Sequence, residues 1–135
     1  METGGYKGKS RVLSRSELHA AITHGLGIPA VNIVCEYGMS ELSSQAYDTV
    51  AGSTTASAAR GFRFPPWVRT AIVSPETGRE VQEGETGLIR VYDLANVHSV
   101  MAIQTEDLGH RIADVFVLEG RATQAEARGC SLMSA

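Results

Sequence analysis

The spacing of apolar residues near the N-terminus predicts one amphipathic helix, which we expect to run from Arg15 to His24. Ser14 and Glu17 have the spacing of a capping box at the start of this helix, in which each side chain binds the backbone amide of the other residue. Gly25 follows the last apolar repeat, and glycine commonly ends a helix because it adopts a left-handed conformation easily. The sequence therefore predicts both ends of the helix.

The segment after the helix predicts a strand, a second helix and a loop. The apolar run Ala30–Cys35 is typical of a short, largely buried strand. A short helix is expected from about Leu42 to Tyr47. Ala51–Gly61 is rich in small and polar residues without periodicity, which favours a surface loop. This loop lacks the Gly-Lys-Ser/Thr ending of a phosphate-binding P-loop.

From Trp67 onward the sequence is typical of β-structure, with short strand-like runs between turn residues. Strands are expected at Val68–Val73, Leu88–Tyr92 and Val115–Leu118, separated by segments rich in Gly, Pro, Thr and Glu. The whole pattern predicts an α+β fold, in which an α/β unit is followed by antiparallel β-strands. We expect a single domain over residues 1–135, with the helix and first strand in 1–60 and the β-rich part in 61–135.

Composition and charge exclude several classes of function. The 12 Lys and Arg residues against 15 Asp and Glu give a net charge of -3, without the basic patch that nucleic-acid binding requires. No apolar run is long enough to span a membrane. The 2 cysteines and 4 histidines do not have the spacing of a disulfide framework or a metal site. Reduced cysteines are typical of a cytoplasmic protein.

Four short segments contain residues that are candidates for binding a nucleotide. They are Glu2–Gly8 with its glycine-rich turn, Tyr37-Gly38-Met39-Ser40-Glu41, Thr105-Glu106-Asp107, and Gly120-Arg121. In this order and spacing they resemble the motifs of adenylate-forming enzymes, the superfamily of acyl ligases and luciferases. Three further stretches, Glu36–Asp48, Asp93–Asn96 and Arg128–Leu132, are most similar to the acyl-protein synthetases of bacterial luminescence. The resemblance covers nearly the whole chain and implies the C-terminal portion of the large domain of such an enzyme.

The resemblance implies a set of nucleotide-binding residues that includes Gly38, with ATP or AMP and Mg²⁺ as cofactors. It implies that Tyr37 stacks on adenine while Gly4 and Gly5 allow the backbone to approach the opposite face of the base. Asp107 would accept hydrogen bonds from both ribose hydroxyls, because a carboxylate offers two oxygens. Arg121 would reach the ribose or a phosphate.

Two residues of the second motif and one near the C-terminus are implied to take part in catalysis. Ser40, which stands where the superfamily usually has Thr, would donate its hydroxyl to the α-phosphate. Glu41 would bind Mg²⁺, which prefers carboxylate oxygens. Cys130 would receive the acyl group from the adenylate, and the cation of Arg128 would favour its thiolate. Glu106 replaces the usual Gly of the third motif, as in the acyl-protein synthetases.

Each candidate also has a structural interpretation that needs no ligand. Tyr37 and Glu41 would suit a turn from a strand into a helix, with Glu41 in the first turn of that helix. Asp107 would suit a turn near Gly109. Arg121 would then be a surface cation, and Cys130 a small apolar residue. Cys35 lies in a predicted buried strand, which favours a structural role for this cysteine.

The sequence leaves three hypotheses open for the chain as a whole. One is a fragment of an ATP-dependent ligase that acts on a fatty acid or another carboxylate, with the phosphate loop and most of the acyl pocket in a missing N-terminal portion. Another is a non-catalytic nucleotide- or acyl-binding module. The third is one half of a split enzyme, completed by a partner chain or by self-association into a homo-oligomer.

Overall fold

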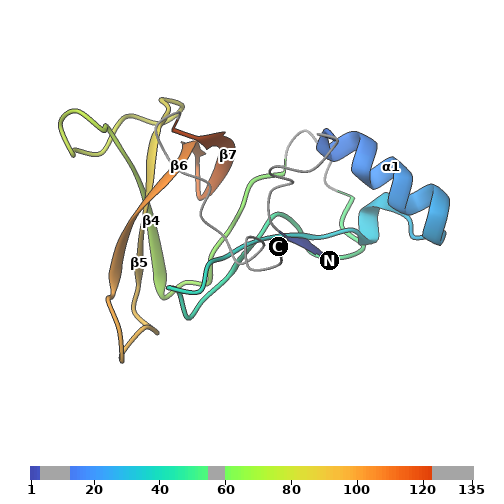
Figure 1. Ribbon diagram of the computed structural model, residues 1–135, viewed down its shortest axis with the longest axis horizontal. Coiled ribbons are helices and arrows are strands. Elements are labelled where there is room, and N and C mark those ends of the chain that lie inside the picture. Colours follow the sequence, from blue (N-terminus) through green and yellow to red (C-terminus); the bar gives the residue numbers. More distant parts are fainter. Residues whose placement is uncertain (4–12, 55–59, 123–135) are drawn as a thin grey trace, which may run out of the picture.

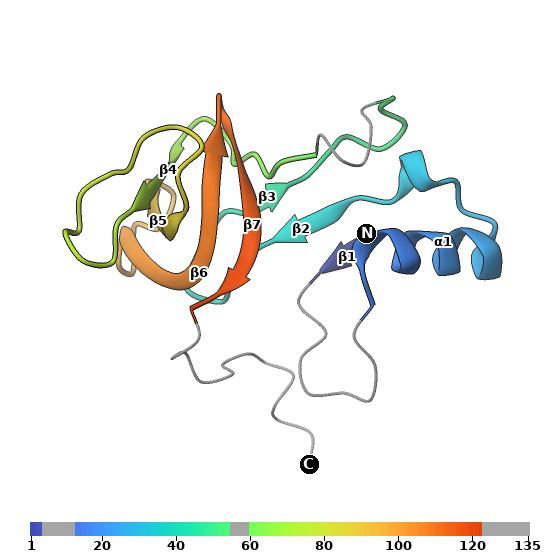
Figure 2. The same ribbon diagram turned by 90° about the horizontal axis from the view of Figure 1, so that it is seen from above.

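The chain folds into two β-sheets and one α-helix in the computed structural model, which describes residues 1–3, 13–54 and 60–122. A three-stranded sheet has the order β1-β2-β3, and a four-stranded sheet has the order β4-β5-β6-β7. Figures 1 and 2 show helix α1 beyond the small sheet, at the end of the molecule away from the larger sheet. The predicted α+β fold is therefore confirmed.

Helix α1 spans Arg15–Leu26 and begins with the predicted capping box. The Ser14 hydroxyl accepts the Glu17 amide at 3.3 Å, and the Glu17 carboxylate accepts the Ser14 amide at 2.8 Å. The predicted end at Gly25 is wrong. Gly27 is the residue in the left-handed conformation, with φ of 66°, and its amide donates to the Thr23 carbonyl at 3.0 Å.

The small sheet corrects two predictions. Residues Ala30–Asn32 form a 3-10 helix, η1, rather than the start of a strand, and strand β2 covers only Cys35–Tyr37. β2 pairs in parallel with β1 (Glu2–Thr3). The predicted helix at 42–47 is wrong, because Ala46–Tyr47 form strand β3, which pairs antiparallel with β2. Pairing with a neighbouring strand outweighs the weak local helix preference of this segment.

The larger sheet is an antiparallel meander. It consists of β4 (Val68–Val73), β5 (Gly87–Asp93), β6 (Ala102–Ile112) and β7 (Val115–Arg121). The three predicted strands are present, and β6 is the strand that the sequence did not predict. Most side chains of β6 are exposed or half-buried, so its sequence lacks the apolar run that marks a buried strand.

Gly109 lies within β6 rather than in the turn that one sequence interpretation placed near it. A Cβ atom at this position would lie 2.5 Å from the carbonyl oxygen of Val117 on the neighbouring strand. Glycine is therefore needed for a close approach of two backbones at an irregularity in the β6–β7 pairing.

A cluster of aromatic side chains joins the two sheets. Phe116 of β7 is 2% exposed and stacks on Phe62, with 5.5 Å between the ring centroids. The backbones of the same two residues exchange hydrogen bonds at 2.7 and 3.0 Å. Phe64 stacks on the Phe116 ring at 5.9 Å, and Tyr37 meets the same ring edge-on at 5.2 Å. This cluster places the end of β2 against the β6–β7 pair.

No helix among the described residues is long and apolar enough to cross a membrane.

Candidate functional site

Three of the predicted site residues come together at the junction of the two sheets. The Tyr37 hydroxyl donates a hydrogen bond to Oδ2 of Asp107 at 3.0 Å, and Nε of Arg121 donates to Oδ1 at 2.9 Å. Tyr37 ends β2, Asp107 lies in the middle of β6, and Arg121 ends β7 directly opposite Asp107. The fold therefore brings residues from three separate motifs into one hydrogen-bonded group, which we call the Asp107 group.

Thr105 fixes the backbone beside Asp107. Its buried hydroxyl donates to the Ile89 carbonyl at 2.7 Å and accepts the Asp107 amide at 3.2 Å. Glu106, between these two residues, has an exposed side chain. Strand alternation thus turns Thr105 and Asp107 toward the protein and Glu106 away from it.

The environment of the Asp107 group keeps the Tyr37 phenol protonated at neutral pH, so its hydroxyl is the donor in the bond to Asp107. Burial raises the pKa of Tyr37 well above its ordinary value, and the charge of the Asp107 carboxylate raises it further. The Asp107 side chain retains 15% exposure and that of Arg121 retains 26%. The Asp107 carboxylate is therefore bound by Tyr37 and Arg121 and remains partly exposed to solvent.

The ring of Tyr37 is mostly covered. It is 7% exposed and contacts Phe62, Phe64 and Phe116. The ring of Tyr37 therefore packs among these aromatic side chains, and its hydroxyl binds the Asp107 carboxylate. The stacking of adenine on this ring stays a prediction.

Ser40 and Glu41 lie on an exposed loop that follows β2. The Ser40 hydroxyl donates to Oε2 of Glu41 at 3.2 Å, and both residues are exposed. Gly38, at the start of this loop, has the Glu36 carboxylate 3.0 Å from where a Cβ atom would stand. We call residues 38–45, which connect β2 to β3, the motif loop.

The motif loop is tied to the larger sheet by two polar residues, Asp93 at the end of β5 and Asn96 just after it. Asp93 is fully buried, and its carboxylate accepts the backbone amides of Ser43 and Ser44 at 3.0 and 2.8 Å. The Asn96 side-chain amide donates to the Glu41 carbonyl at 2.8 Å. The sequence analysis included both residues in the stretch Asp93–Asn96 that carries the resemblance, but it gave neither of them a role. A signal was present, because Asp93 continues the alternation of buried Ile89 and Val91 and so had to face inward.

The donor chemistry of the motif loop suits Mg²⁺ only in part. Among the described residues no three His, Cys, Asp or Glu side chains cluster as a metal site. Glu41 provides one exposed carboxylate. Magnesium in nucleotide sites commonly takes one or two carboxylates and completes its shell with phosphates and water. A single carboxylate therefore fits an ion that is held largely by the nucleotide.

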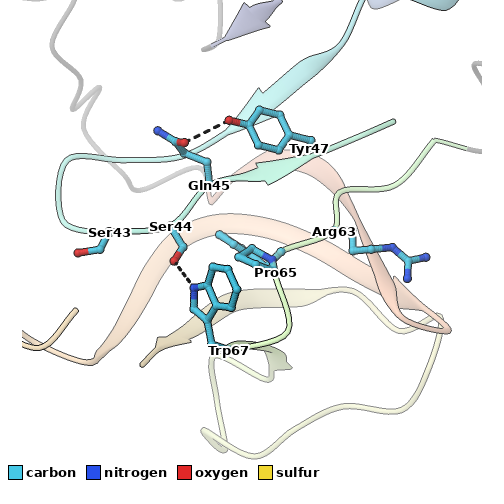
Figure 3. A pocket seen from close by; sticks show the side chains of 8 residues that line it. Ser43, Ser44, Gln45, Tyr47, Arg63, Pro65 and Trp67 are labelled. Atoms are coloured by element: carbon cyan, nitrogen blue, oxygen red, sulfur yellow. Dashed lines mark hydrogen bonds between the residues drawn. The ribbon is translucent and has the colours of Figure 1, made fainter. Parts of the chain in front are cut away.

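An open groove lies behind the motif loop, on the side of β3. It is lined by Ser43, Ser44, Gln45, Tyr47, Arg63, Phe64, Pro65 and Trp67. Figure 3 shows the Trp67 indole pointing to Ser44, whose hydroxyl accepts the indole N–H at 3.0 Å. The predicted site residues Ser40, Glu41 and Asp107 are not among its lining residues.

The remaining predicted site residues cannot be placed. Gly4, Gly5 and Cys130 lie outside the described residues. Cys35 is described and is buried in β2, as expected for a structural cysteine. Burial raises the pKa of its thiol to about 12, with a smaller contribution from the charge of Glu2. Cys35 is therefore protonated and covered at neutral pH, which makes it a poor nucleophile.

The fold matches part of several solved structures. The chain is 21% identical to apo MatB from Rhodopseudomonas palustris, with a TM-score of 0.60 over 90% of this chain and 25% of that one. It is 19% identical to McyG A-PCP complexed with phenylalanyl-adenylate, with a TM-score of 0.57 over 90% and 24% of the two chains. One of the fatty acyl-adenylate ligases from E. coli and L. pneumophila gives 16% identity and a TM-score of 0.56 over 81% and 27%.

No protein-family model matches the chain, and no curated protein matches it. The chain spans about a quarter of the length of the structures above. At these identities the likeness shows the fold. The described residues have the fold of the C-terminal portion of the large domain of adenylate-forming enzymes.

Proposed function

We propose that this chain is part of an ATP-dependent acyl-activating ligase and supplies the ribose-facing side of its nucleotide site. The Asp107 group carries the proposal, because Tyr37 and Arg121 each bind a different oxygen of one partly exposed carboxylate. A carboxylate has about four lone-pair directions, so each oxygen can accept one more hydrogen bond. Two adjacent ribose hydroxyls are ligands that match this pair of oxygens.

The other residues of the proposed site lie on the motif loop. Ser40 would donate its hydroxyl to the α-phosphate. This residue is exposed, and its hydroxyl donates to Glu41 in the structure. Glu41 would hold Mg²⁺, which would neutralise phosphate charge when bound. Gly4, Gly5 and Gly38 complete the proposed nucleotide contacts.

The full reaction belongs to the whole ligase. A carboxylate oxygen of a fatty acid or another acid attacks the α-phosphorus of ATP, and pyrophosphate leaves to give acyl-AMP. In the acyl-protein synthetase branch the thiolate of Cys130 then attacks the acyl carbon, and AMP leaves as the thioester forms. A cytoplasmic location is part of this proposal.

A second candidate is a nucleotide-binding module without catalysis. It is favoured by the fact that all three members of the Asp107 group contact one another within the described residues. In the third candidate, the remainder of the site comes from a partner chain or a second copy.

Calorimetric titration of the chain with adenosine, AMP and a non-hydrolysable acyl-adenylate analogue tests the proposed site. We expect binding of all three, and Asp107→Asn should weaken each of them by about tenfold or more because one ribose-binding oxygen is lost. Asp114→Asn makes the same change on an exposed carboxylate and should leave binding unchanged. Equal binding by the wild type and by Asp107→Asn would contradict the proposal.

The acyl-transfer part of the proposal has its own test. The chain is incubated with a synthetic acyl-AMP, and the modified residue is found by mass spectrometry. We expect a hydroxylamine-sensitive acyl group on Cys130 that is lost in Cys130→Ser, while buried Cys35 serves as the internal control. Nucleotide binding without acylation would favour the module.

A further inference from the structure

We infer that Asp93 is a positioning residue that holds the motif loop in the shape needed to present Ser40 to a phosphate. The inference rests on the proposed function, because that function supplies the phosphate. Asp93 itself is fully buried at the end of β5 and has no access to a ligand. Its effect on the site would therefore pass entirely through the loop.

The Asp93 carboxylate accepts hydrogen bonds from backbone amides of the motif loop. Oδ2 accepts the Ser43 and Ser44 amides, and Oδ1 accepts the Ser44 hydroxyl at 3.0 Å and the Ala95 amide at 3.0 Å. Each carboxylate oxygen is therefore shared by two donors. The loop is bound at consecutive residues, which fixes its direction as well as its position.

Asn96 binds the same loop at a second place, the backbone carbonyl of Glu41. Its side-chain amide donates to the Glu41 carbonyl and also to the Val100 carbonyl at 2.9 Å, while its Oδ1 accepts the Ser43 hydroxyl at 3.1 Å. Ser40 and Glu41 are exposed and lie just before these anchored residues. The exposed part of the loop is thus anchored by two buried polar residues, Asp93 and Asn96, which we call the clamp.

The burial of Asp93 depends on the arrangement of the motif loop, because most of its hydrogen-bond donors come from Ser43 and Ser44. No cation forms a salt bridge with Asp93 within the described part of the chain, so hydrogen bonds alone compensate its burial. Burying a carboxylate costs free energy unless hydrogen bonds compensate for the lost water, and here the Ser43, Ser44 and Ala95 donors do so. A buried carboxylate that binds a loop backbone is well suited to selecting one loop conformation.

Trp67 gives a direct report on the clamp without any ligand. It is the only tryptophan of the chain, and its indole N–H donates to the Ser44 hydroxyl (Figure 3). The same hydroxyl donates to Oδ1 of Asp93. A change at Asp93 should therefore move the indole N–H resonance. Amide hydrogen exchange at Ser43 and Ser44 reports on the same bonds.

The experiment compares wild type, Asp93→Asn and the exposed control Asp114→Asn in nucleotide binding and amide exchange. For Asp93→Asn we expect a shifted Trp67 indole resonance and faster exchange of the Ser43 and Ser44 amides. We also expect AMP affinity to fall by about tenfold while adenosine affinity stays within about twofold, because only AMP carries the phosphate that Ser40 would meet. Asp107→Asn should weaken adenosine and AMP alike.

Several outcomes would overturn the inference. One is unchanged exchange at Ser43 and Ser44 in Asp93→Asn, which decides the matter even if the wild type binds no nucleotide and the proposed function fails. Another is a loss of AMP affinity no greater than the loss of adenosine affinity. If circular dichroism shows that Asp93→Asn does not fold, Asn96→Ala removes the bond to Glu41 instead. The same selective loss of AMP binding is then required.

Discussion

The hydroxyl of Tyr37 lies 3.0 Å from Oδ2 of Asp107, which joins two motifs that are 70 residues apart in the chain. Tyr37 ends a strand of the small sheet, and Asp107 lies in the larger sheet. This single bond therefore spans the junction of the two sheets. The position of the proposed ribose-binding carboxylate depends on the packing of the aromatic cluster beneath it.

Replacing Tyr37 with Phe should weaken adenosine binding without removing it. The Phe ring keeps the aromatic contacts, but Oδ2 of Asp107 loses one partner and becomes less fixed. The lost hydrogen bond is made to Asp107 and not to the ligand, so we expect a loss of affinity smaller than that of Asp107→Asn. Tyr47→Phe makes the same change at a hydroxyl bound only to Gln45 among the described residues, and calorimetry should show no effect. A similar loss in both variants would contradict the role of Tyr37.

Phe116→Ala should be strongly destabilising. Phe116 is 2% exposed and contacts Tyr37, Phe62 and Phe64, so its removal leaves a cavity at the junction of the sheets. Such truncations cost about 3–5 kcal/mol, measurable by urea unfolding. Leu94→Ala, at a side chain that is 61% exposed, should stay within about 0.5 kcal/mol. Equal midpoints for the two variants would show that the junction is not part of the core.

Asp48→Asn should destabilise the fold by leaving a buried arginine without its counter-charge. Oδ1 of Asp48 accepts the Cys35 amide at 2.7 Å, and Oδ2 lies 3.7 Å from the Arg60 guanidinium, whose side chain is 3% exposed. Breaking a buried pair from one side costs about 3–5 kcal/mol in urea unfolding.

The control for this change is Asp114→Asn, which breaks an exposed pair with Arg63 and should cost less than about 1 kcal/mol. Adding Arg60→Met to Asp48→Asn should restore part of the lost stability. A double variant that is less stable than Asp48→Asn would show that Arg60 acts mainly through its bonds to the Ile33 and Ala30 carbonyls.

Stability should fall as the solution becomes alkaline. The pKa of Cys35 rises to about 12 in the folded chain, from an ordinary value of about 8.5, and burial also raises that of Tyr37. The folded state therefore holds these protons more tightly, so their contribution is complete below the unfolded pKa and is lost as pH rises toward the folded one. Melting temperatures at about pH 8 and about pH 10.5 measure the loss. Cys35→Ala should reduce it, and an unchanged loss would exclude Cys35 as a source.

The local features of the sequence predicted the parts of the fold that depend on local interactions. The capping box of Ser14 and Glu17 needs only neighbouring residues, and it is confirmed. The strands that begin at Val68 and Val115 need only short runs of strand-forming residues between turns, and both are confirmed. The end of α1 was missed by two residues, because Gly25 and Gly27 are both suited to end a helix and the pattern does not choose between them.

Long-range contacts decided what the sequence alone could not. Strand β6 is mostly polar and is held by pairing with β5 and β7, so no local pattern marks it. Ala46 and Tyr47 became a strand because β2 lies beside them. The motif order named Tyr37, Asp107 and Arg121 as members of one site, but only the packing of the two sheets brought their polar atoms within hydrogen-bond distance. Hydrogen bonds act over about 3 Å, and residues far apart in sequence reach that distance only when the tertiary fold places them there.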